Sequence, residues 1–549
     1  MGTIGSIASG VRQSVADSVF EAKVLHEAGV LGLHRPDKSV KVVSAFMRWG
    51  ASPALGVTTA AIHYPDETGL IDERGSLTFE QLHRRSNALA HAFAAMGIGP
   101  GDGIGVMCRN HRGFIEVTLA AAKLGASALY LNTMFAGPQL VEVMRREGPK
   151  ALVYDEEFTD LLDGVDESIA RVVGWTDGAA EGKTIDSLIA ANDDSNHKPP
   201  PDKPRFVILT SGTTGTPRGA QRSSPDGLLA LAALIDMIPY RARDTMMIAA
   251  PLFHSWGFFH FVMSLPTAST IVLRRRFDEE GTLRAVQEHR AQVLGVVPVM
   301  LQRILRLPEE TLSSYDLSSL RITSASGSTL PGEMAIEWMD RFGDTVYNLY
   351  GSTEVAYATV ATPEDLRAAP GTAGRPPHGT VVRLFDEAGR EVPRGEVGRI
   401  FVGNEMSFEG YTGGGGKEAI GGLLCSGDVG HLDSAGRLFI DGRDDEMIVS
   451  GGENVFPREV EDLLADHEAV VEVAVIGVED EEFGQRLKAF VVVAGGAEVD
   501  EDELRAHVKS NLAGYKTPRE IEFMEELPRN ATGKVLKREL RERKTEKSA

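Results

Sequence analysis

A loop rich in glycine and hydroxyl side chains occupies residues 210–219 and reads TSGTTGTPRG. It follows an apolar stretch, residues 206–209, that favours a buried strand. Glycines let backbone N–H groups turn toward a phosphate, and hydroxyls add further donors. Arg218 could neutralise the charge of a departing phosphate. The spacing is not the Walker pattern. A loop without a ligand is the alternative, but the length of the run favours phosphate binding.

A second segment, residues 350–354, reads YGSTE and pairs an aromatic ring with a carboxylate. An aromatic face suits a nucleobase, as at Tyr350. A carboxylate suits a hard cation that also binds phosphate oxygens, as at Glu354. Alone, such a pentapeptide could be any turn, so this interpretation depends on its companions.

The other residues with potential chemical roles lie toward the end of the chain. Asp428 follows Ser-Gly, Arg443 comes 15 residues later, and Lys534 ends the segment PRNATGK over residues 528–534. An ammonium between a carboxylate and a phosphate would attract both anions, and would offset charge as oxygen attacks phosphorus. A lone lysine before a helix is usually a solvated charge, and Arg443 alone could be an ordinary ion-pair partner.

Together, and in this order over almost the whole chain, these motifs resemble those of the adenylate-forming superfamily. That group includes acyl-CoA synthetases, firefly luciferases and the adenylation domains of peptide synthetases. The acyl-CoA synthetase branch is the expected one. The resemblance implies that Tyr350 stacks on adenine and that Thr353 contacts the α-phosphate. It also implies that Asp428 and Arg443 contact the ribose, and that Lys534 catalyses the first half-reaction.

The same resemblance implies the rest of the site. The expected catalytic residues are Lys534, Thr213, Arg218 and Glu354, with Glu354 and Thr213 holding Mg²⁺. Asp445 falls at the hinge between the two domains. Residues that bind ATP or line the arm of coenzyme A are expected at Thr210, Ser211, Gly212, Thr214, Gly215, Gly327, Ser328, Tyr350, Gly351, Ser352, Thr353, Asp428, Arg443, Gly451, Gly452 and Glu453.

The chain departs from the family pattern at two places in the phosphate loop. Arg218 stands where lysine is usual, and the histidine that often follows is absent from residues 221–225. A planar guanidinium and a point-like ammonium are not interchangeable. A non-catalytic acyl-nucleotide binding protein is therefore an alternative. The intact segment 350–354 and Lys534 favour an enzyme.

An apolar acyl pocket is expected around His254, Trp256, Phe258 and Val297, although such apolar residues fill ordinary cores by default. Residues 253–259 contain no acidic side chain, which argues against an amino-acid substrate. A medium- or long-chain fatty acid is the first expectation, and an aryl or sterol-derived acid the second. Coenzyme A is the expected acceptor, and a carrier protein is the alternative.

Composition limits the other classes of function. The chain has 549 residues, a net charge of −22 and two cysteines. The acidic balance argues against nucleic-acid binding and a polybasic lipid anchor. Two cysteines exclude a cysteine-rich zinc site and fit a reducing, cytoplasmic compartment. No apolar run is long enough to span a membrane. A homodimer is expected only because it is the commonest oligomer.

The elements that must position these residues alternate between strand and helix, which predicts an α/β fold. Helices are expected at 77–95, 114–128 and 138–147, and a turn at 97–105. A small β subdomain is expected at 374–403. After residue 442 the predicted strands and helices follow an α+β pattern, with a last helix from residue 534. Residues 1–442 are predicted to form an adenylation domain of two α/β subdomains plus the β subdomain. A hinge at 443–446 and a small mobile domain at 447–549 would follow.

Overall fold

The structure is a computed structural model that describes most of the chain. The described residues are 16–32, 35–179, 181–201, 204–210, 218–222, 227–406, 408–411, 416–446, 448–450, 453–480, 484–495, 497, 499–530 and 533–543. Within them, none of the helices has the length and apolar character needed to cross a bilayer. The first helices are residues 16–27, α2 (Pro36–Trp49) and α3 (Pro53–His63).

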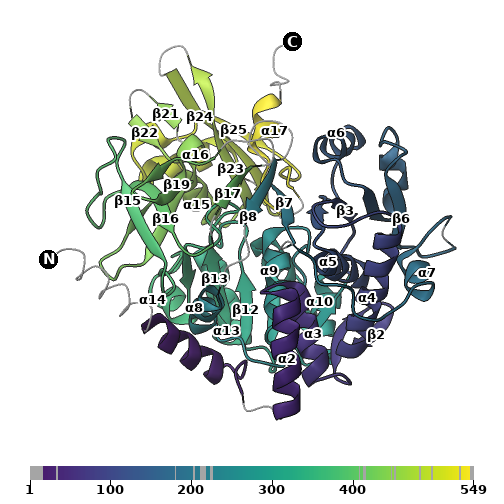
Figure 1. Cartoon of the computed structure of the whole chain (residues 1–549). Helices are drawn as coiled ribbons and strands as arrows, with labels where there is room; N and C mark the ends of the chain where they lie inside the picture. Colours follow the sequence, from purple (N-terminus) through teal and green to yellow (C-terminus); the bar gives the residue numbers. More distant parts are fainter. Residues whose placement is uncertain are drawn as a thin grey trace.

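The first sheet has seven strands, in the order β17-β8-β7-β4-β3-β5-β6. Figure 1 labels β17, β8, β7, β3 and β6 of this sheet. Its central strands are parallel and almost wholly buried, as expected for a sheet covered on both faces. Its helices are α4 (Phe79–Ala95), α5 (Arg112–Leu124), α6 (Gly137–Glu147) and α7 (Ile185–Ala190). The strands are β3 (Gly103–Met107), β4 (Ser127–Tyr130), β5 (Ala151–Asp155), β6 (Ala170–Trp175), β7 (Phe206–Thr210), β8 (Arg218–Arg222) and β17 (Phe408–Tyr411).

A second sheet has eight strands, in the order β14-β13-β12-β11-β9-β10-β1-β2. One large apolar cluster includes residues from both sheets, so they share a core. The strands are β1 (Thr68–Asp72), β2 (Gly75–Thr78), β9 (Thr245–Ile248), β10 (Thr270–Leu273), β11 (Val293–Val296), β12 (Ile322–Ala325), β13 (Val346–Tyr350) and β14 (Thr359–Ala361). The helices are α8 (Leu229–Met237), α9 (Ser255–Ser264), α10 (Glu279–Glu288), α11 (Pro298–Leu305), α12 (Glu309–Ser313), α13 (Gly332–Phe342) and α14 (Pro363–Ala368).

A third sheet, antiparallel throughout, forms a small β subdomain. It contains β15 (Val381–Phe385), β16 (Gly398–Gly403), β18 (Ala419–Ile420), β19 (Leu423–Leu432) and β20 (Leu438–Arg443). The β subdomain therefore extends well beyond the predicted end at residue 403. The long strand β19 carries Asp428, and its register places Asp428 opposite Arg443 on β20.

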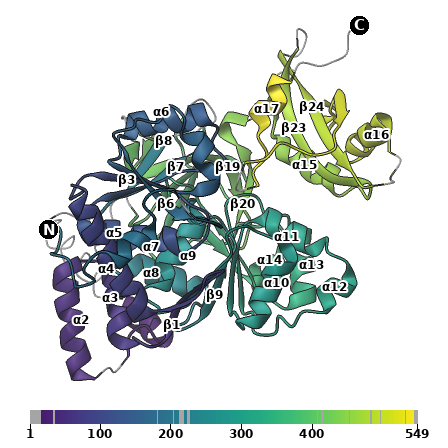
Figure 2. The ribbon, with the colours of Figure 1, turned by 90° about the vertical axis from the view of Figure 1, so that its right-hand side faces the viewer.

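The C-terminal part has its own sheet and its own apolar cluster. Figure 2 shows it as a separate body beside β19 and β20. The predicted α/β fold with a smaller α+β domain at its end is confirmed. Its elements are β21 (Ile448–Ser450), β22 (Glu453–Val455), α15 (Pro457–Ala465), β23 (Val470–Asp480), β24 (Gly484–Val493), α16 (Glu501–Asn511), β25 (Glu520–Phe523) and α17 (Lys537–Glu542).

Several other predicted boundaries were also wrong. The helix expected from residue 77 begins at Phe79, because Thr78 caps it, and the helix expected from residue 114 begins at Arg112. The helix expected to reach residue 128 ends at Leu124, because Gly125 adopts a left-handed conformation that caps it and β4 begins two residues later. The turn expected at 97–105 ends where β3 starts at Gly103. The last helix begins at Lys537 rather than residue 534, because the preceding residues form a turn around Gly533, which has φ +78°.

Candidate active site

A cavity of about 1320 Å³ is lined by residues of the large domain, the β subdomain and the C-terminal domain. It brings together the predicted site residues between Gly327 and Glu354 with Asp428, Arg443 and Lys534. These lining residues are Gly327, Ser328, Tyr350, Gly351, Ser352, Thr353, Glu354, Asp428, Arg443 and Lys534, together with His254, Trp256, Phe258 and Val297 of the predicted acyl pocket.

Other predicted residues fall where less is described. Thr210 ends β7 and pairs with Arg218 at the start of β8, so the two ends of the phosphate loop are neighbours. Asp445 lies in a short turn, Asp444–Glu446, and Glu453 begins β22. Outside the described residues lie Ser211, Gly212, Thr213, Thr214, Gly215, Gly451 and Gly452. Their roles stay predictions.

Tyr350 and Asp428 both line the cavity and are hydrogen bonded to each other. The Tyr350 hydroxyl donates a 2.6 Å hydrogen bond to Asp428 Oδ2, and Arg443 Nη1 lies 3.5 Å from Oδ1. Burial raises the pKa of Asp428, although Arg443, Tyr350, Lys534 and Lys417 oppose the shift. Burial, with Asp428 next to it, also raises the pKa of Tyr350 well above its usual range. An aromatic ring and a carboxylate acceptor therefore border one space.

Glu354 is held by two hydroxyls. Tyr411 Oη donates to Glu354 Oε1 at 2.6 Å, and Ser352 Oγ donates to Oε2 at 2.9 Å. Burial alone would raise the pKa of Glu354, but these hydrogen bonds and the charge of Lys417 bring it below its ordinary value. Glu354 is therefore an anion at neutral pH, and each of its oxygens keeps lone pairs for a hard cation. The residue fits a magnesium ligand.

Sequence reasoning missed two members of this cluster. Tyr411 lies on β17 and Lys417 follows the glycine run 413–416, and both line the cavity. Lys417 acts electrostatically on Glu354 and on Asp428. The only local signal was a lysine after four glycines, and nothing in the sequence linked it to Glu354, far earlier in the chain.

Lys534 lies on the C-terminal domain but lines the same cavity, and its charge acts on Asp428. A tight turn presents it. Asn530 Oδ1 accepts from the Lys534 backbone N–H at 2.9 Å, and Gly533 adopts φ +78°. The turn touches the large domain directly, since a Cβ at Gly533 would collide with Val299 at the start of α11. The sequence could not indicate this contact.

An ion-pair cluster fixes the same turn. Arg529 Nη2 lies 3.0 Å from Glu472 Oε2 on β23, and Arg306 of the large domain lies 3.8 Å from Glu472 Oε1. Arg529 also donates to the carbonyl of Gly533. Glu472 therefore links the two domains to the turn that carries Lys534.

A Glu472→Gln substitution should weaken this link. We expect the acyl-adenylate formation that the sequence motifs imply to slow a few-fold, a loss of ~1 kcal/mol. The effect is small because Arg306 is partly exposed and water screens its charge. Pyrophosphate release in a single turnover measures the effect. Thioester formation from preformed acyl-adenylate should be unchanged. Glu468→Gln, an exposed residue of the same domain, is the control. Equal losses in both steps would contradict a specific role of Glu472 in holding the turn of Lys534 against the large domain.

The far part of the cavity is apolar. Trp256, Phe258 and Val262 on α9 line it, with residues of α3 and α8. Trp256 is fixed by a 2.8 Å hydrogen bond from Nε1 to the carbonyl of Val296 and stacks on Phe259. His254 also lines the cavity. Its Nε2 is buried without a hydrogen-bond partner among the described residues.

His254 should make the protein sensitive to acid. Burial lowers the pKa of His254 from 6.5 to about 4, so the folded protein keeps it neutral where the unfolded chain binds a proton. The contribution of His254 to folding stability is therefore lost as pH falls from 6.5 to 4. We expect the Tm of a His254→Phe variant to fall less steeply over that interval than wild type. Parallel slopes by thermal unfolding would contradict this.

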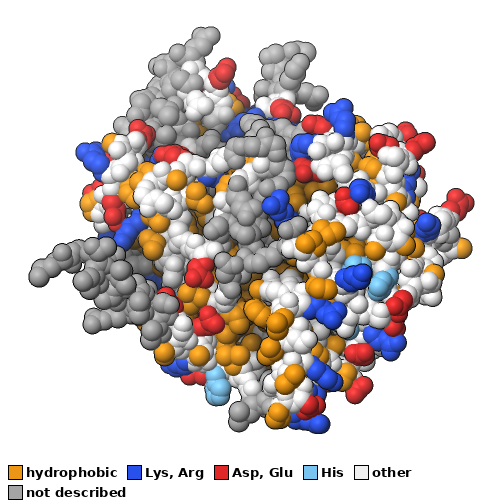
Figure 3. All heavy atoms as spheres, viewed as in Figure 1, with side chains coloured by type: hydrophobic (Ala, Val, Ile, Leu, Met, Phe, Trp, Pro, Cys, Tyr) orange, Lys and Arg blue, Asp and Glu red, His pale blue; other side chains and the backbone are white. Residues whose placement is uncertain are grey.

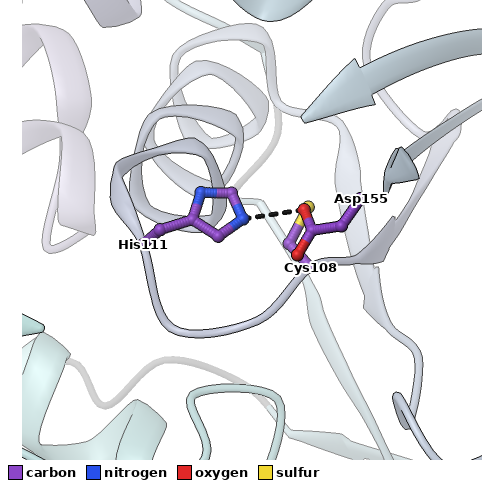
Figure 4. Close-up of side chains that lie close together, drawn as sticks. All are labelled: Cys108, His111 and Asp155. Carbon is purple, nitrogen blue, oxygen red and sulfur yellow. Dashed lines mark hydrogen bonds and ion pairs between the residues drawn. The ribbon is translucent and has the colours of Figure 1, made fainter. Parts of the chain in front are cut away.

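A second cluster, Cys108, His111 and Asp155, could superficially serve as a metal or nucleophile site (Figure 4). His111 Nε2 lies 2.8 Å from Asp155 Oδ1, and its Nδ1 accepts from the Gly113 backbone N–H. Both ring nitrogens are therefore used. Burial, and the adjacent Asp155, raise the pKa of the Cys108 thiol well above its usual range. The cluster is best explained as a structural network that fixes the start of α5.

Comparisons with known proteins cover most of the chain. The family model described as AMP-binding enzyme matches residues 57–412, and the one described as AMP-binding enzyme C-terminal domain matches residues 459–534. A fatty acid–acyl-carrier-protein ligase, ScoC of Streptomyces coeruleorubidus, is 31% identical over 497 residues, which cover 88% of this chain and 94% of that protein.

Two further proteins illustrate the range of relatives. A feruloyl-CoA synthase of an Amycolatopsis species is 33% identical over 494 residues, covering 87% of this chain and 96% of the relative. Among solved structures, the amide bond synthetase McbA from Marinactinospora thermotolerans superposes with a TM-score of 0.79 at 28% identity, covering 89% of this chain and 98% of the other. The similarity therefore extends over both domains.

Proposed function

Because this chain belongs to the AMP-binding enzymes of the adenylate-forming superfamily, we propose that it activates an apolar carboxylic acid with ATP and transfers the acyl group to coenzyme A. One observation carries the proposal. The far, apolar part of the cavity, which we call the apolar arm, is continuous with the part lined by Tyr350, Glu354, Asp428 and Lys534. An acyl chain and a nucleotide can therefore meet with their reacting ends together.

In the first half-reaction the substrate carboxylate attacks the α-phosphorus of ATP and pyrophosphate leaves. Lys534 attracts both reacting groups and offsets charge, and Tyr350 and Asp428 orient the adenosine. Thr213 and Arg218 are assigned to the polyphosphate by the sequence motif alone. Glu354, with Thr213, would hold Mg²⁺, which neutralises charge on the phosphate oxygens. Positioning and charge neutralisation do most of the work in such transfers.

In the second half-reaction the C-terminal domain rotates about Asp445 and withdraws Lys534. Residues 451–453 then line the tunnel for the pantetheine group of coenzyme A. The thiol loses its proton, its sulfur attacks the acyl carbon, and AMP departs. A medium- or long-chain fatty acid is the first choice of substrate, because apolar side chains of α3, α8 and α9 line the far part of the cavity and α9 carries no acidic side chain. Aryl and sterol-derived acids come second.

The acceptor has one serious alternative. A relative named as a fatty acid–acyl-carrier-protein ligase shares 31% of its residues with this chain, which supports a carrier-protein thiol as the second candidate. We prefer coenzyme A because no insertion is recognised near the β subdomain.

Pyrophosphate release tests the proposal. The enzyme is incubated with Mg·ATP and a panel of short, long-chain, aryl and sterol-derived acids. Each acid is tested alone, with coenzyme A, and with a phosphopantetheinylated carrier protein. We expect release with apolar acids, increased by coenzyme A and matched by AMP. Acceleration by the carrier protein alone would replace coenzyme A as acceptor. Binding of ATP without release from any acid would overturn the catalytic proposal.

A further inference from the structure

Helix α2 presents apolar side chains to solvent. It buries Ala45 and Trp49 against the large domain. The opposite face carries Val40, Val43 and Met47, which are 70%, 59% and 82% exposed. The spacing of three and four residues places them in one stripe along the helix. Among the described residues nothing covers this stripe, which we call the α2 stripe. An exposed apolar stripe of this kind marks an interaction surface.

The apolar arm of the cavity reaches the surface beside the α2 stripe. Phe46, on α2, is 55% exposed and also lines the cavity. Leu228 and Val262 combine the same two properties, at 38% and 37% exposure. Figure 3 shows hydrophobic side chains gathered on this face, over α2 and the surface between α2 and α8. The stripe and the mouth of the arm therefore belong to one apolar surface.

The charge of this segment is opposite to that of the chain. Residues 35–50 contain four basic side chains and one acidic one, which gives +3, whereas the whole chain carries −22. Arg35 and Lys41 are exposed. An apolar stripe with basic flanks suits the surface of an anionic bilayer, where acyl-chain contact and electrostatic attraction act together. In a symmetric dimer formed through the same stripe, the basic side chains of the two copies would face each other and repel.

We propose that the α2 stripe docks on an anionic lipid surface and that long-chain acids enter the apolar arm from the bilayer past Phe46, Leu228 and Val262. The acid remains in an apolar environment throughout, so it does not cross water as a free monomer. The entry route rests on the proposed function, whereas the docking does not require it.

Vesicle flotation tests the docking with the full-length protein. The vesicles contain phosphatidylcholine with or without phosphatidylglycerol. The test variant carries Val40→Glu, Val43→Glu and Met47→Glu, none of which lines the cavity. The matched control carries glutamate at three other exposed apolar positions, Val381, Val397 and Phe523. We expect wild type and control to float with the anionic vesicles, and the bound fraction of the test variant to fall at least about ten-fold.

Activity provides the second readout. Turnover of a short water-soluble acid should be equal in all three proteins, whereas turnover of a long-chain acid supplied in vesicles should fall only in the test variant. Absence of turnover in every protein would reject the ligase function and leave the flotation result intact. Equal flotation of test variant and wild type, or none for wild type, would overturn the docking. So would a wild-type dimer that the test substitutions convert to monomer by analytical ultracentrifugation.

Discussion

A Lys534→Ala enzyme is expected to form acyl-adenylate about 100- to 1000-fold more slowly than wild type. Lys534 and Asp428 line the same cavity, and the charge of Lys534 acts on Asp428. In the proposed function, Lys534 is the cation that the C-terminal domain brings to the reacting groups. Loss of one group aimed at developing charge has an effect of this size. Single-turnover pyrophosphate release measures the rate. The same variant should transfer the acyl group from preformed acyl-adenylate to coenzyme A at nearly the wild-type rate.

The two half-reactions provide the internal control for this prediction. A variant that merely disturbed the fold would slow both of them. Arg538→Ala is the matched control, because Arg538 lies shortly after Lys534 in the chain and its side chain is 55% exposed. It should leave both rates unchanged. If Lys534→Ala forms acyl-adenylate at the wild-type rate, the assignment of Lys534 is wrong.

A Glu354→Gln enzyme is expected to lose roughly 100-fold in acyl-adenylate formation and to need more Mg²⁺ for half-maximal rate. The substitution keeps the shape of the side chain. One of the two hydroxyls, Ser352 or Tyr411, can still donate to the amide oxygen, and the other can accept from the amide NH2 through its own oxygen. What disappears is the negative charge that a hard cation requires. Titration of pyrophosphate release with Mg²⁺ checks the result.

Tyr411→Phe is the matched variant for Glu354. It removes one hydrogen bond that lowers the pKa of Glu354, so that pKa should rise and the acidic limb of the rate profile should move to higher pH. The loss at neutral pH should be much smaller than for Glu354→Gln. An unchanged Mg²⁺ requirement in Glu354→Gln would show that the cation is held elsewhere.

The fold was largely predictable because its elements have strong local signals. Apolar strands followed by amphipathic helices indicate an α/β chain wherever they occur. Pro457 at the first turn of α15 and Thr78 at the cap of α4 mark helix starts directly. The boundary errors arose where backbone conformation decides, as at Gly125 and Gly533, whose left-handed conformations no periodicity reveals.

The site was predictable only along its motifs. Tyr350, Glu354, Asp428 and Lys534 stand in conspicuous segments, so their common cavity could be anticipated from a resemblance. Tyr411, Lys417 and Glu472 stand in no such segment. They reach the site because β17 joins the edge of the first sheet and because β23 lies against the turn of Lys534. Such placements depend on tertiary pairing, which a single sequence does not contain.

The contact between Gly533 and Val299 bears on how fast the two domains can separate. Residue 533 is a glycine, so it has no side chain that would interlock with Val299. The two surfaces can therefore slide past each other. Charged contacts, such as the ion pair of Arg306 with Glu472, then provide most of the resistance to separation. Dissolved salt screens such contacts. If domain separation limits turnover, moderate ionic strength should accelerate the complete reaction while it slows the half-reaction that needs the closed form.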